Sequence, residues 1–302
     1  GGMYLLQTVT AVYLRLLGHE ISNGGFVLDV NETPDPEEFE DAYMRYANAR
    51  VCPPRPAEKT YRVRGTQEPF YTLNVIDGIM SVSAVQKVAK QYQASITEYL
   101  NAVLLYSLLQ KQEHDFHLRL RPVRIAMPVN LRRFFPSKTL RNFITMVYPS
   151  IDPRLGDYTF EEIVTQVHHY MRYYINSKFL RGDITTNAST QRNPLIRIVP
   201  LFLKDFVVRQ FYQRVQDKNS SAGLTNMGAI RVPDDMKPYL ERFDIYMGIP
   251  YSQRTNCAIV SFEDTLTVNF ASCIIEADVE RRFFQKLVED GIPVTIESNR
   301  EL

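Results

Sequence analysis

The chain has 302 residues, of which 45% are apolar and 12% aromatic, a length and composition that exclude general disorder and allow a large buried core. It carries 35 Lys and Arg against 34 Asp and Glu, so its formal net charge of +1 produces no overall field that attracts nucleic acid or an anionic membrane. The three cysteines lack metal or disulfide spacing, and no apolar run reaches the about 20 residues that cross a bilayer, so we expect a cytoplasmic protein without a membrane span.

The first predicted element is a helix over residues 3–17, where apolar residues recur at helical spacing until Gly18. Its apolar arc is so wide that we expect it to be buried between elements. Because the chain starts inside this helix, at Gly1 and Gly2, we expect a segment to be missing upstream. The helix would then contact that missing segment or a second copy of the chain.

Residues 31–70 are rich in Pro, Glu, Asp and Arg, which indicates a linker or surface excursion. One helix is expected within it, over residues 37–49, because that stretch begins with acidic residues and ends with arginine.

From residue 71 the pattern alternates between strands and helices. We expect a strand over 71–80, a helix capped by Ser81 or Ser83, and a second helix that starts at the Thr97 hydroxyl and continues to Leu109. The later expected strands cover 118–130, 143–148, 223–227, 244–248, 256–262 and 265–271, and the later helices cover 160–180, 196–215 and 278–289. The pair Glu263-Asp264 is the expected hairpin turn.

The adjacent histidines His168 and His169 invite a metal or general-base interpretation. No nearby carboxylate in the sequence is placed to orient either ring, so we interpret both as surface or half-buried helix positions. The remaining histidines are isolated, so spacing predicts no metal site and no Ser-His-Asp arrangement. The glycines also form no dinucleotide-binding or P-loop motif.

Two junctions between a strand and a loop are candidate binding sites. At each junction a strand places polar side chains in a turn. These side chains can bind a ligand or form hydrogen bonds with the local backbone, and the residue types alone favour the hydrogen bonds with the backbone. The first junction contains Asn130, Arg132, Arg133 and Asn142, and the second contains Thr225, Asn226 and Gly228.

The order of these landmarks resembles the chloramphenicol acetyltransferase-like superfamily, especially alcohol O-acetyltransferases and the condensation domains of peptide synthetases. In that family a His-x-x-x-Asp-Gly motif leads directly into a helix, and the helix after Gly1-Gly2 looks like that one. Segment 94–102 and the two junctions are similar to the landmarks that follow. The chain departs from the family in having no Asp-Phe-Gly-Trp-Gly motif, which suggests a divergent alcohol-acetyltransferase branch.

The resemblance implies an α/β fold of the two-layer α+β kind, with helices packed on a mixed sheet. Residues 1–70 would belong to the first lobe and residues 71–302 would form the second. The implied activity is CoA-dependent acyl transfer to a small-molecule alcohol or amine, with acyl-CoA as co-substrate and no permanently bound cofactor. An alternative is a non-catalytic interaction module that binds a partner chain.

For the site, the resemblance implies that the catalytic histidine lies upstream of this chain and that Gly1 and Gly2 belong to the loop after its motif. Thr225 or Asn226 would donate a hydrogen bond to the oxyanion. The remaining candidates would shape the substrate tunnel or meet CoA phosphates; they are Asn130, Arg132, Arg133, Asn142 and Gly228.

Overall fold

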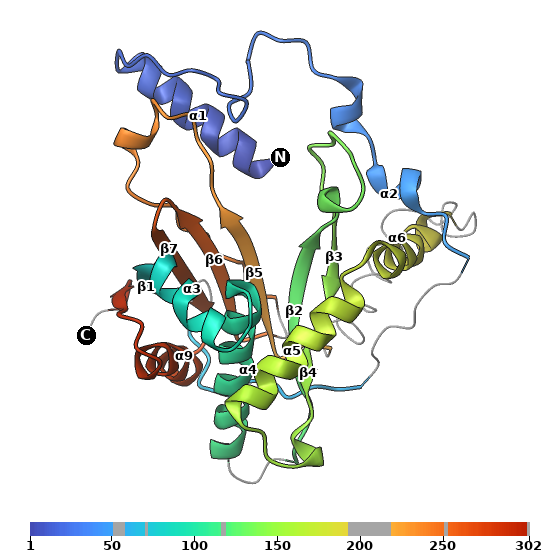
Figure 1. Ribbon diagram of the computed structural model, residues 1–302, viewed down its shortest axis with the longest axis vertical. Helices are drawn as coiled ribbons and strands as arrows, with labels where there is room; N and C mark the ends of the chain where they lie inside the picture. The colour runs from blue at the N-terminus through green and yellow to red at the C-terminus, as the bar shows by residue number, and fades with distance from the viewer. Residues whose placement is uncertain (51–57, 70–71, 116–118, 193–218, 251–252, 301–302) are drawn as a thin grey trace.

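The computed structural model describes residues 1–50, 58–69, 72–115, 119–192, 219–250 and 253–300. Their strands form one mixed sheet in the order β3-β2-β5-β6-β7-β1-β8, with β4 paired to β2 (Figure 1). This confirms the predicted mixed α/β fold. The strands are β1 (Asn74–Ser81), β2 (Val123–Asn130), β3 (Ile144–Val147), β4 (Ser150–Ile151), β5 (Ala222–Ala229), β6 (Thr255–Phe262), β7 (Thr265–Ser272) and β8 (Thr295–Ser298).

The sheet divides between two neighbouring parallel strands. β2 and β5 pair only through Ile125 with Ala222 and Ala126 with Gly223, whereas β5 and β6 pair along most of their length. Beyond these two positions β2 and β5 spread apart, as Figure 1 shows. The sheet therefore has two arms, one built on β2, β3 and β4 and the other on β5, β6, β7, β1 and β8.

One face of the sheet carries helices around α4 (Ile96–His114), which is apolar on most sides and buried along most of its length. It contacts α3 (Val82–Gln91), α5 (Phe160–Tyr174) and α9 (Asp278–Glu289). Aromatic rings join these layers, because Phe270 of β7 packs edge-on against Phe283 and Phe284 of α9. The helices on this face thus share one core with both arms.

The start of α4 differs from the sequence prediction. Ser95, not Thr97, caps the helix: its hydroxyl accepts from the Glu98 backbone N–H, and the Glu98 carboxylate accepts from the Ser95 N–H. This reciprocal capping box satisfies two backbone donors that a cap at Thr97 would leave free. The Thr97 hydroxyl is consequently available for a contact with another element. By contrast, the predicted cap of α3 by Ser81 is confirmed.

The N-terminal helix α1 (Gly2–Leu16) and the excursion after it extend across the ends of the two arms. A small separate core, which includes Ala11, Leu14 and Val260, packs α1 on the β6 side. Gly18 then adopts a positive φ of 93°, which confirms the predicted helix stop. A Cβ atom at Gly1 would overlap the carbonyl oxygen of Leu140, so the other end of α1 lies close to the β2–β3 loop.

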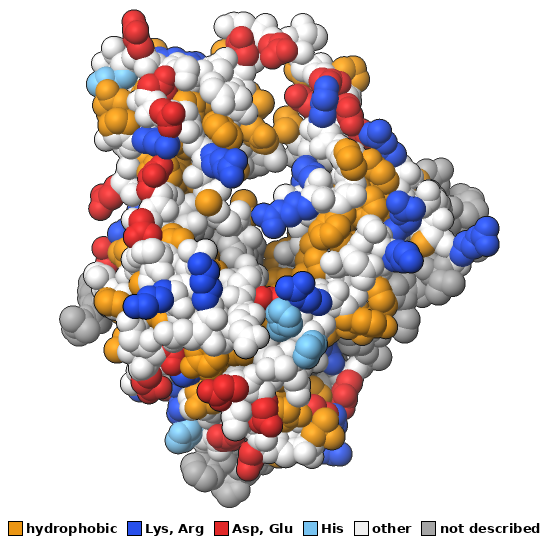
Figure 2. All heavy atoms as spheres, in the orientation of Figure 1, with side chains coloured by type: hydrophobic (Ala, Val, Ile, Leu, Met, Phe, Trp, Pro, Cys, Tyr) orange, Lys and Arg blue, Asp and Glu red, His pale blue; other side chains and the backbone are white. Residues whose placement is uncertain are grey.

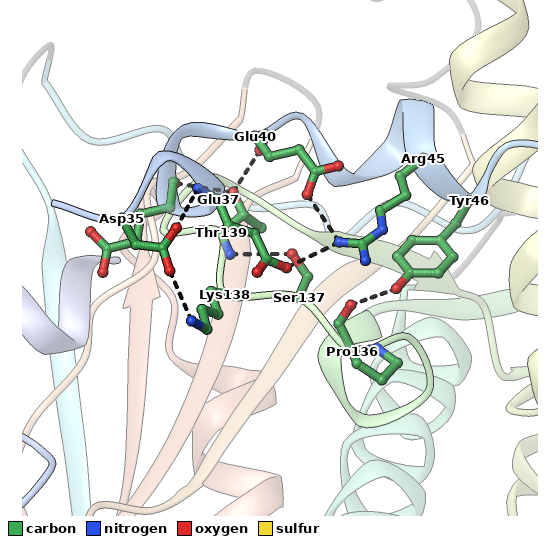
Figure 3. Close-up of polar contacts among 10 residues, drawn as sticks. Asp35, Glu37, Glu40, Arg45, Tyr46, Pro136, Ser137, Lys138 and Thr139 are labelled. Carbon is green, nitrogen blue, oxygen red and sulfur yellow. Dashed lines mark hydrogen bonds and ion pairs between the residues drawn. The ribbon is translucent and has the colours of Figure 1, made fainter.

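The excursion is anchored to the same loop (Figure 3). Lys138 pairs with Asp35 at 2.8 Å, the Thr139 hydroxyl donates to the Glu40 carbonyl, and Tyr46 donates to the Pro136 carbonyl. The helix expected over 37–49 is here a short 3-10 helix, η1 (Pro36–Phe39), followed by α2 (Ala42–Tyr46). Contacts with the β2–β3 loop account for this difference, because the Glu38 and Glu40 carbonyls, which a continuous helix would use, accept from the Leu140 N–H and the Thr139 hydroxyl.

Two other predicted elements change, and one strand was not predicted. The helix over 160–180 is two helices, α5 and α6 (Ser177–Arg192), because the Asn176 side chain caps a new start by accepting from the Lys178 and Phe179 N–H groups. The expected strand 244–248 is irregular, since its backbone is held by side chains such as Asn269 and Asn256. β8, which the sequence analysis did not identify, pairs with β1 at the sheet edge.

The helix expected over 196–215 lies outside the described residues. Within the parts of the chain that the structure describes, no helix is long and apolar enough to cross a membrane.

Candidate functional site

A pocket of roughly 520 Å³ opens where the two arms separate. Its walls come from the ends of β2 and β5, the first turn of α4 and the last turn of α5, so elements distant in the sequence converge there. Ligands of open α/β sheets commonly bind beyond the carboxyl ends of parallel strands. The lining residues are Thr97, Glu98, Met127, Pro128, Val129, Asn130, Arg133, Phe134, Met171, Arg172, Ile175, Asn226 and Met227.

Both strand-to-loop junctions identified in the sequence reach this pocket. Asn130 ends β2, and its side-chain oxygen accepts from the Arg132 N–H, which starts the short 3-10 helix η2 (Leu131–Arg133). That turn places Arg133 and Phe134 at the pocket wall. The other junction contributes Asn226 from β5. The pocket therefore gathers Asn130, Arg133 and Asn226 from the predicted set.

Asn226 connects β5 to α4. Its side-chain nitrogen donates to the Thr97 hydroxyl at 2.8 Å, and its oxygen accepts from the Gly228 N–H at 2.8 Å. Gly228 has a φ of 75°, and the pairing of β5 with β6 shifts register between Asn226 and Ala229. Such a bulge re-aims the side chains next to it. Gly228 thus shapes the strand end without lining the pocket.

The other predicted residues lie outside the pocket lining. Thr225 is half-buried one position before Asn226, so its side chain leaves the opposite face of the strand. Arg132 donates to the carbonyls of Thr139 and Arg141, and burial lowers the pKa of its guanidinium. Asn142 is exposed. Gly1 and Gly2 begin α1 beside the β2–β3 loop.

The structure supplies a carboxylate for His168 that the local sequence does not. Glu98, from the first turn of α4, places Oε1 3.2 Å from His168 Nδ1, although this contact lacks hydrogen-bond geometry. On the other side of the ring, Arg172 Nε donates to His168 Nε2 at 3.1 Å. His168 is a half-buried helix residue, as predicted, and the carboxylate that faces it comes from α4, not from the local sequence, where none is placed to orient the ring. The helix contact between α4 and α5 creates this arrangement, and neither local sequence contains it.

Among the described residues that line the pocket, Glu98 is the one acidic residue, and none is histidine or cysteine. Over the described ranges, no group of three or more such residues could hold a metal ion. The pocket chemistry therefore depends on amides, a hydroxyl, two guanidinium groups and one carboxylate.

Comparison with known proteins identifies the fold. No family model matches the chain, and a search of curated proteins found no match. Among solved structures, the nonribosomal peptide synthetase FmoA3 aligns with a TM-score of 0.51 at 11% identity, covering 78% of this chain and 23% of the synthetase. The chain thus has the predicted chloramphenicol acetyltransferase-like fold.

Two further matches have lower TM-scores. The epimerization domain from the third module of tyrocidine synthetase B gives 0.49 at 10% identity, covering 95% of this chain and 65% of that one. Trichothecene 15-O-acetyltransferase from Fusarium sporotrichioides gives 0.44 at 14% identity, covering 91% and 54%. The chain spans less than two thirds of the length of all three structures.

Proposed function

We propose that this chain contributes the second lobe of an acyltransferase that moves an acyl group from a thioester, such as acyl-CoA, to an alcohol or amine. The observation that carries the proposal is the position of Asn226. In a fold shared with acyltransferases, β2 and β5 diverge to open a pocket, and the bulged end of β5 brings an amide donor to its wall. Such a donor suits a reaction in which negative charge develops on oxygen.

The proposed chemistry begins with a base that removes a proton from the acceptor hydroxyl or amine. The acceptor attacks the thioester carbonyl, the carbonyl oxygen becomes an oxyanion, and the carbon–sulfur bond breaks as the carbonyl re-forms and a thiolate leaves. Asn226 Nδ2 gives one of its two hydrogens to Thr97 and retains a second for the oxyanion. One such donor is worth about 2.7 to 4 kcal/mol in the transition state.

The base in this proposal belongs to a His-x-x-x-Asp-Gly segment encoded before Gly1, as the family resemblance implies. Within this chain, the nearest histidine is a poor substitute. The Nε2 atom of His168 accepts from Arg172, and its Nδ1 atom is buried against Glu98, so neither nitrogen is free to take a proton from a substrate.

The test has two stages. The coding sequence upstream of Gly1 should contain the His-x-x-x-Asp-Gly segment, and a protein including it should transfer acetyl groups from acetyl-CoA to members of an alcohol and amine panel. The 302-residue chain alone should show no turnover. A parent sequence without the motif, or turnover by the short chain that survives replacement of its five histidines, would overturn the proposed mechanism.

A second candidate function, a module that binds a partner chain, is favoured by the surface of α1. The helix buries Gln7, Thr8, Ala11 and Leu14 and exposes most of its large apolar side chains. The two candidates are compatible, because an enzyme lobe also needs an apolar surface to join its other lobe.

A further inference from the structure

The candidate pocket contains two arginine side chains that form no ion pair with a carboxylate of the described residues. Arg133 follows the end of β2 and Arg172 lies in the last turn of α5, and both line the pocket. Figure 2 shows Lys and Arg side chains beside the hollow at the centre of this face. Among the described residues, neither guanidinium forms an ion pair with Asp or Glu, and Arg133 has no side-chain hydrogen bond.

Glu98, the acidic residue of the pocket lining, is committed to other groups. Its Oε2 atom accepts from the Ser95 N–H at 2.7 Å as part of the α4 capping box. Its Oε1 atom faces His168 Nδ1 at 3.2 Å. The lining therefore holds two arginines against one carboxylate that is already occupied, so it favours a ligand with negative charge.

His168 determines how Arg172 is held. Because Arg172 Nε–H donates to Nε2, that nitrogen carries a lone pair, and a neutral ring then has its proton on Nδ1, facing the Glu98 carboxylate. In this tautomer the Nδ1–H lies beside the negative charge of Glu98, although the contact lacks hydrogen-bond geometry. The bond uses Nε of Arg172 and leaves its two terminal NH₂ groups, the fork that binds a carboxylate or phosphate, without a described partner.

Part of the pocket wall is apolar. Six side chains from β2, the η2 turn, α5 and β5 supply this part, and they would contact the body of a ligand whose charged end meets the arginines. They are Met127, Val129, Phe134, Met171, Ile175 and Met227.

We propose that this pocket binds a ligand with an apolar body and one oxyanion head group, a carboxylate or a phosphate, through Arg172 and Arg133. His168 is a positioning residue that orients Arg172. The inference rests on the proposed function in taking this pocket as the place where a substrate of the transfer reaction binds, and it adds the chemical class of that substrate.

Three probes with the same six-carbon body test the head group: hexanoate, hexyl phosphate and 1-hexanol, each titrated into the full chain by calorimetry or nuclear magnetic resonance. We expect both anions to bind more tightly than the alcohol. The anion that binds more tightly shows whether the head group of the ligand is a carboxylate or a phosphate ester. Equal binding of 1-hexanol and the anions would overturn the proposal.

Matched variants test the residues. Arg172→Gln should weaken binding of the preferred anion about tenfold or more, since it removes a charge-assisted hydrogen bond, and should leave 1-hexanol unaffected. His168→Leu should cause a smaller loss with the same selectivity, and His168→Gln, whose amide oxygen can accept from Arg172, should restore part of it. Arg281→Gln, which removes a positive charge outside this pocket, is the control and should change nothing.

These results separate the two proposals. If the longer protein, which includes the upstream segment, binds the anion selectively but does not transfer acyl groups, the result would contradict the proposed function alone. Acyl transfer without selective anion binding would contradict the present inference alone. Circular dichroism melts of each variant show whether a change in binding reflects loss of folded protein, and the His168→Gln rescue keeps the test decisive if His168→Leu fails to fold.

Discussion

The side-chain amide of Asn226 donates a hydrogen bond to the hydroxyl oxygen of Thr97 across 2.8 Å. This bond joins the bulged end of β5 to the first turn of α4, and both residues line the pocket. It fixes the orientation of the amide while leaving its second N–H available.

The first prediction tests whether Asn226 or its neighbour Thr225 is the oxyanion donor. In a longer protein that shows transfer activity, Asn226→Ala should lower kcat by about 10² to 10³, as loss of one oxyanion donor does. Thr225→Val should leave kcat near the wild-type value, because Thr225 does not line the pocket. Steady-state kinetics measure both. The opposite ranking of the two variants would remove Asn226 from the mechanism.

Thr97→Val provides the control for orientation. It keeps the Asn226 donor but removes the hydroxyl that holds it, so kcat should fall less than in Asn226→Ala. The lost hydrogen bond should cost about 1 kcal/mol in the free energy of unfolding, measurable with urea.

The second prediction concerns the packing of β1 against α9. A Cβ atom at Gly78 would overlap the ring of Phe284, which is itself nearly buried. Gly78→Ala should therefore lower the free energy of unfolding by about 1 to 3 kcal/mol, the usual cost of an overpacked core. Gly248→Ala is the matched control, since nothing lies within 4 Å of its Cβ position. Equal stability of the two variants would contradict the described contact.

The sequence predicted those parts of the fold that depend on local patterning. Three such features depend on hydrogen bonding and backbone conformation within a few residues. They are the cap of α3 by Ser81, the turn at Glu263, where φ is 51°, and the end of α9 near Gly291, where φ is 83°. Ser95 was missed in favour of Thr97 although its partner, Glu98, lies three residues on and completes the capping-box pattern.

Other features depend on contacts that no local pattern contains. The backbone of 244–248 bonds to side chains of β6 and β7 instead of a neighbouring strand, so its alternation did not produce a strand. The site shows the same limit. Asn130, Arg133 and Asn226 were found because strand ends carry polar residues, whereas the contacts of His168 with Glu98 and Arg172 needed α4 and α5 to pack together.

The third prediction is a pH dependence caused by a buried carboxyl. Glu280 of α9 is 2% exposed, and burial raises its pKa above the ordinary value of 4.5, while a hydrogen bond from the Thr255 hydroxyl opposes the rise. Between the pKa of Glu280 in the unfolded chain and its higher pKa in the folded state, the folded state therefore keeps a proton that the unfolded chain releases. The stability from this group is complete below about pH 4.5 and is lost as the pH rises through the folded-state pKa.

Glu280→Gln removes this titration and keeps an oxygen that can accept from Thr255. The free energy of unfolding of the variant, minus that of the wild type, should grow as the pH rises from about 4.5 to about 7.5, with a slope of at most about 1.4 kcal/mol per pH unit. Asp77, whose pKa is also raised by burial, is present in both proteins and cancels in the difference. Urea unfolding at several pH values measures the slope, and a difference that is flat with pH would contradict the prediction.

The last prediction concerns the exposed apolar side of α1. Leu6 is 47% exposed and Val9 is 58% exposed, while Ala11 on the packed side is fully buried. Burying one such side chain is worth about 1.5 to 3 kcal/mol, so several of them together favour association with another apolar surface. We expect the isolated chain to self-associate through this side of the helix, and Leu6→Asp with Val9→Asp to shift it toward monomer in sedimentation velocity.

The double variant should unfold at nearly the wild-type urea concentration, because neither side chain is in the core. Ala11→Asp is the control for the packed side and should lower that concentration, since it places an unpaired charge in the small core beneath α1. A wild-type chain that sediments as a monomer at every concentration would show that α1 is not a self-association surface, and loss of stability in the double variant would show that this side of the helix is not free.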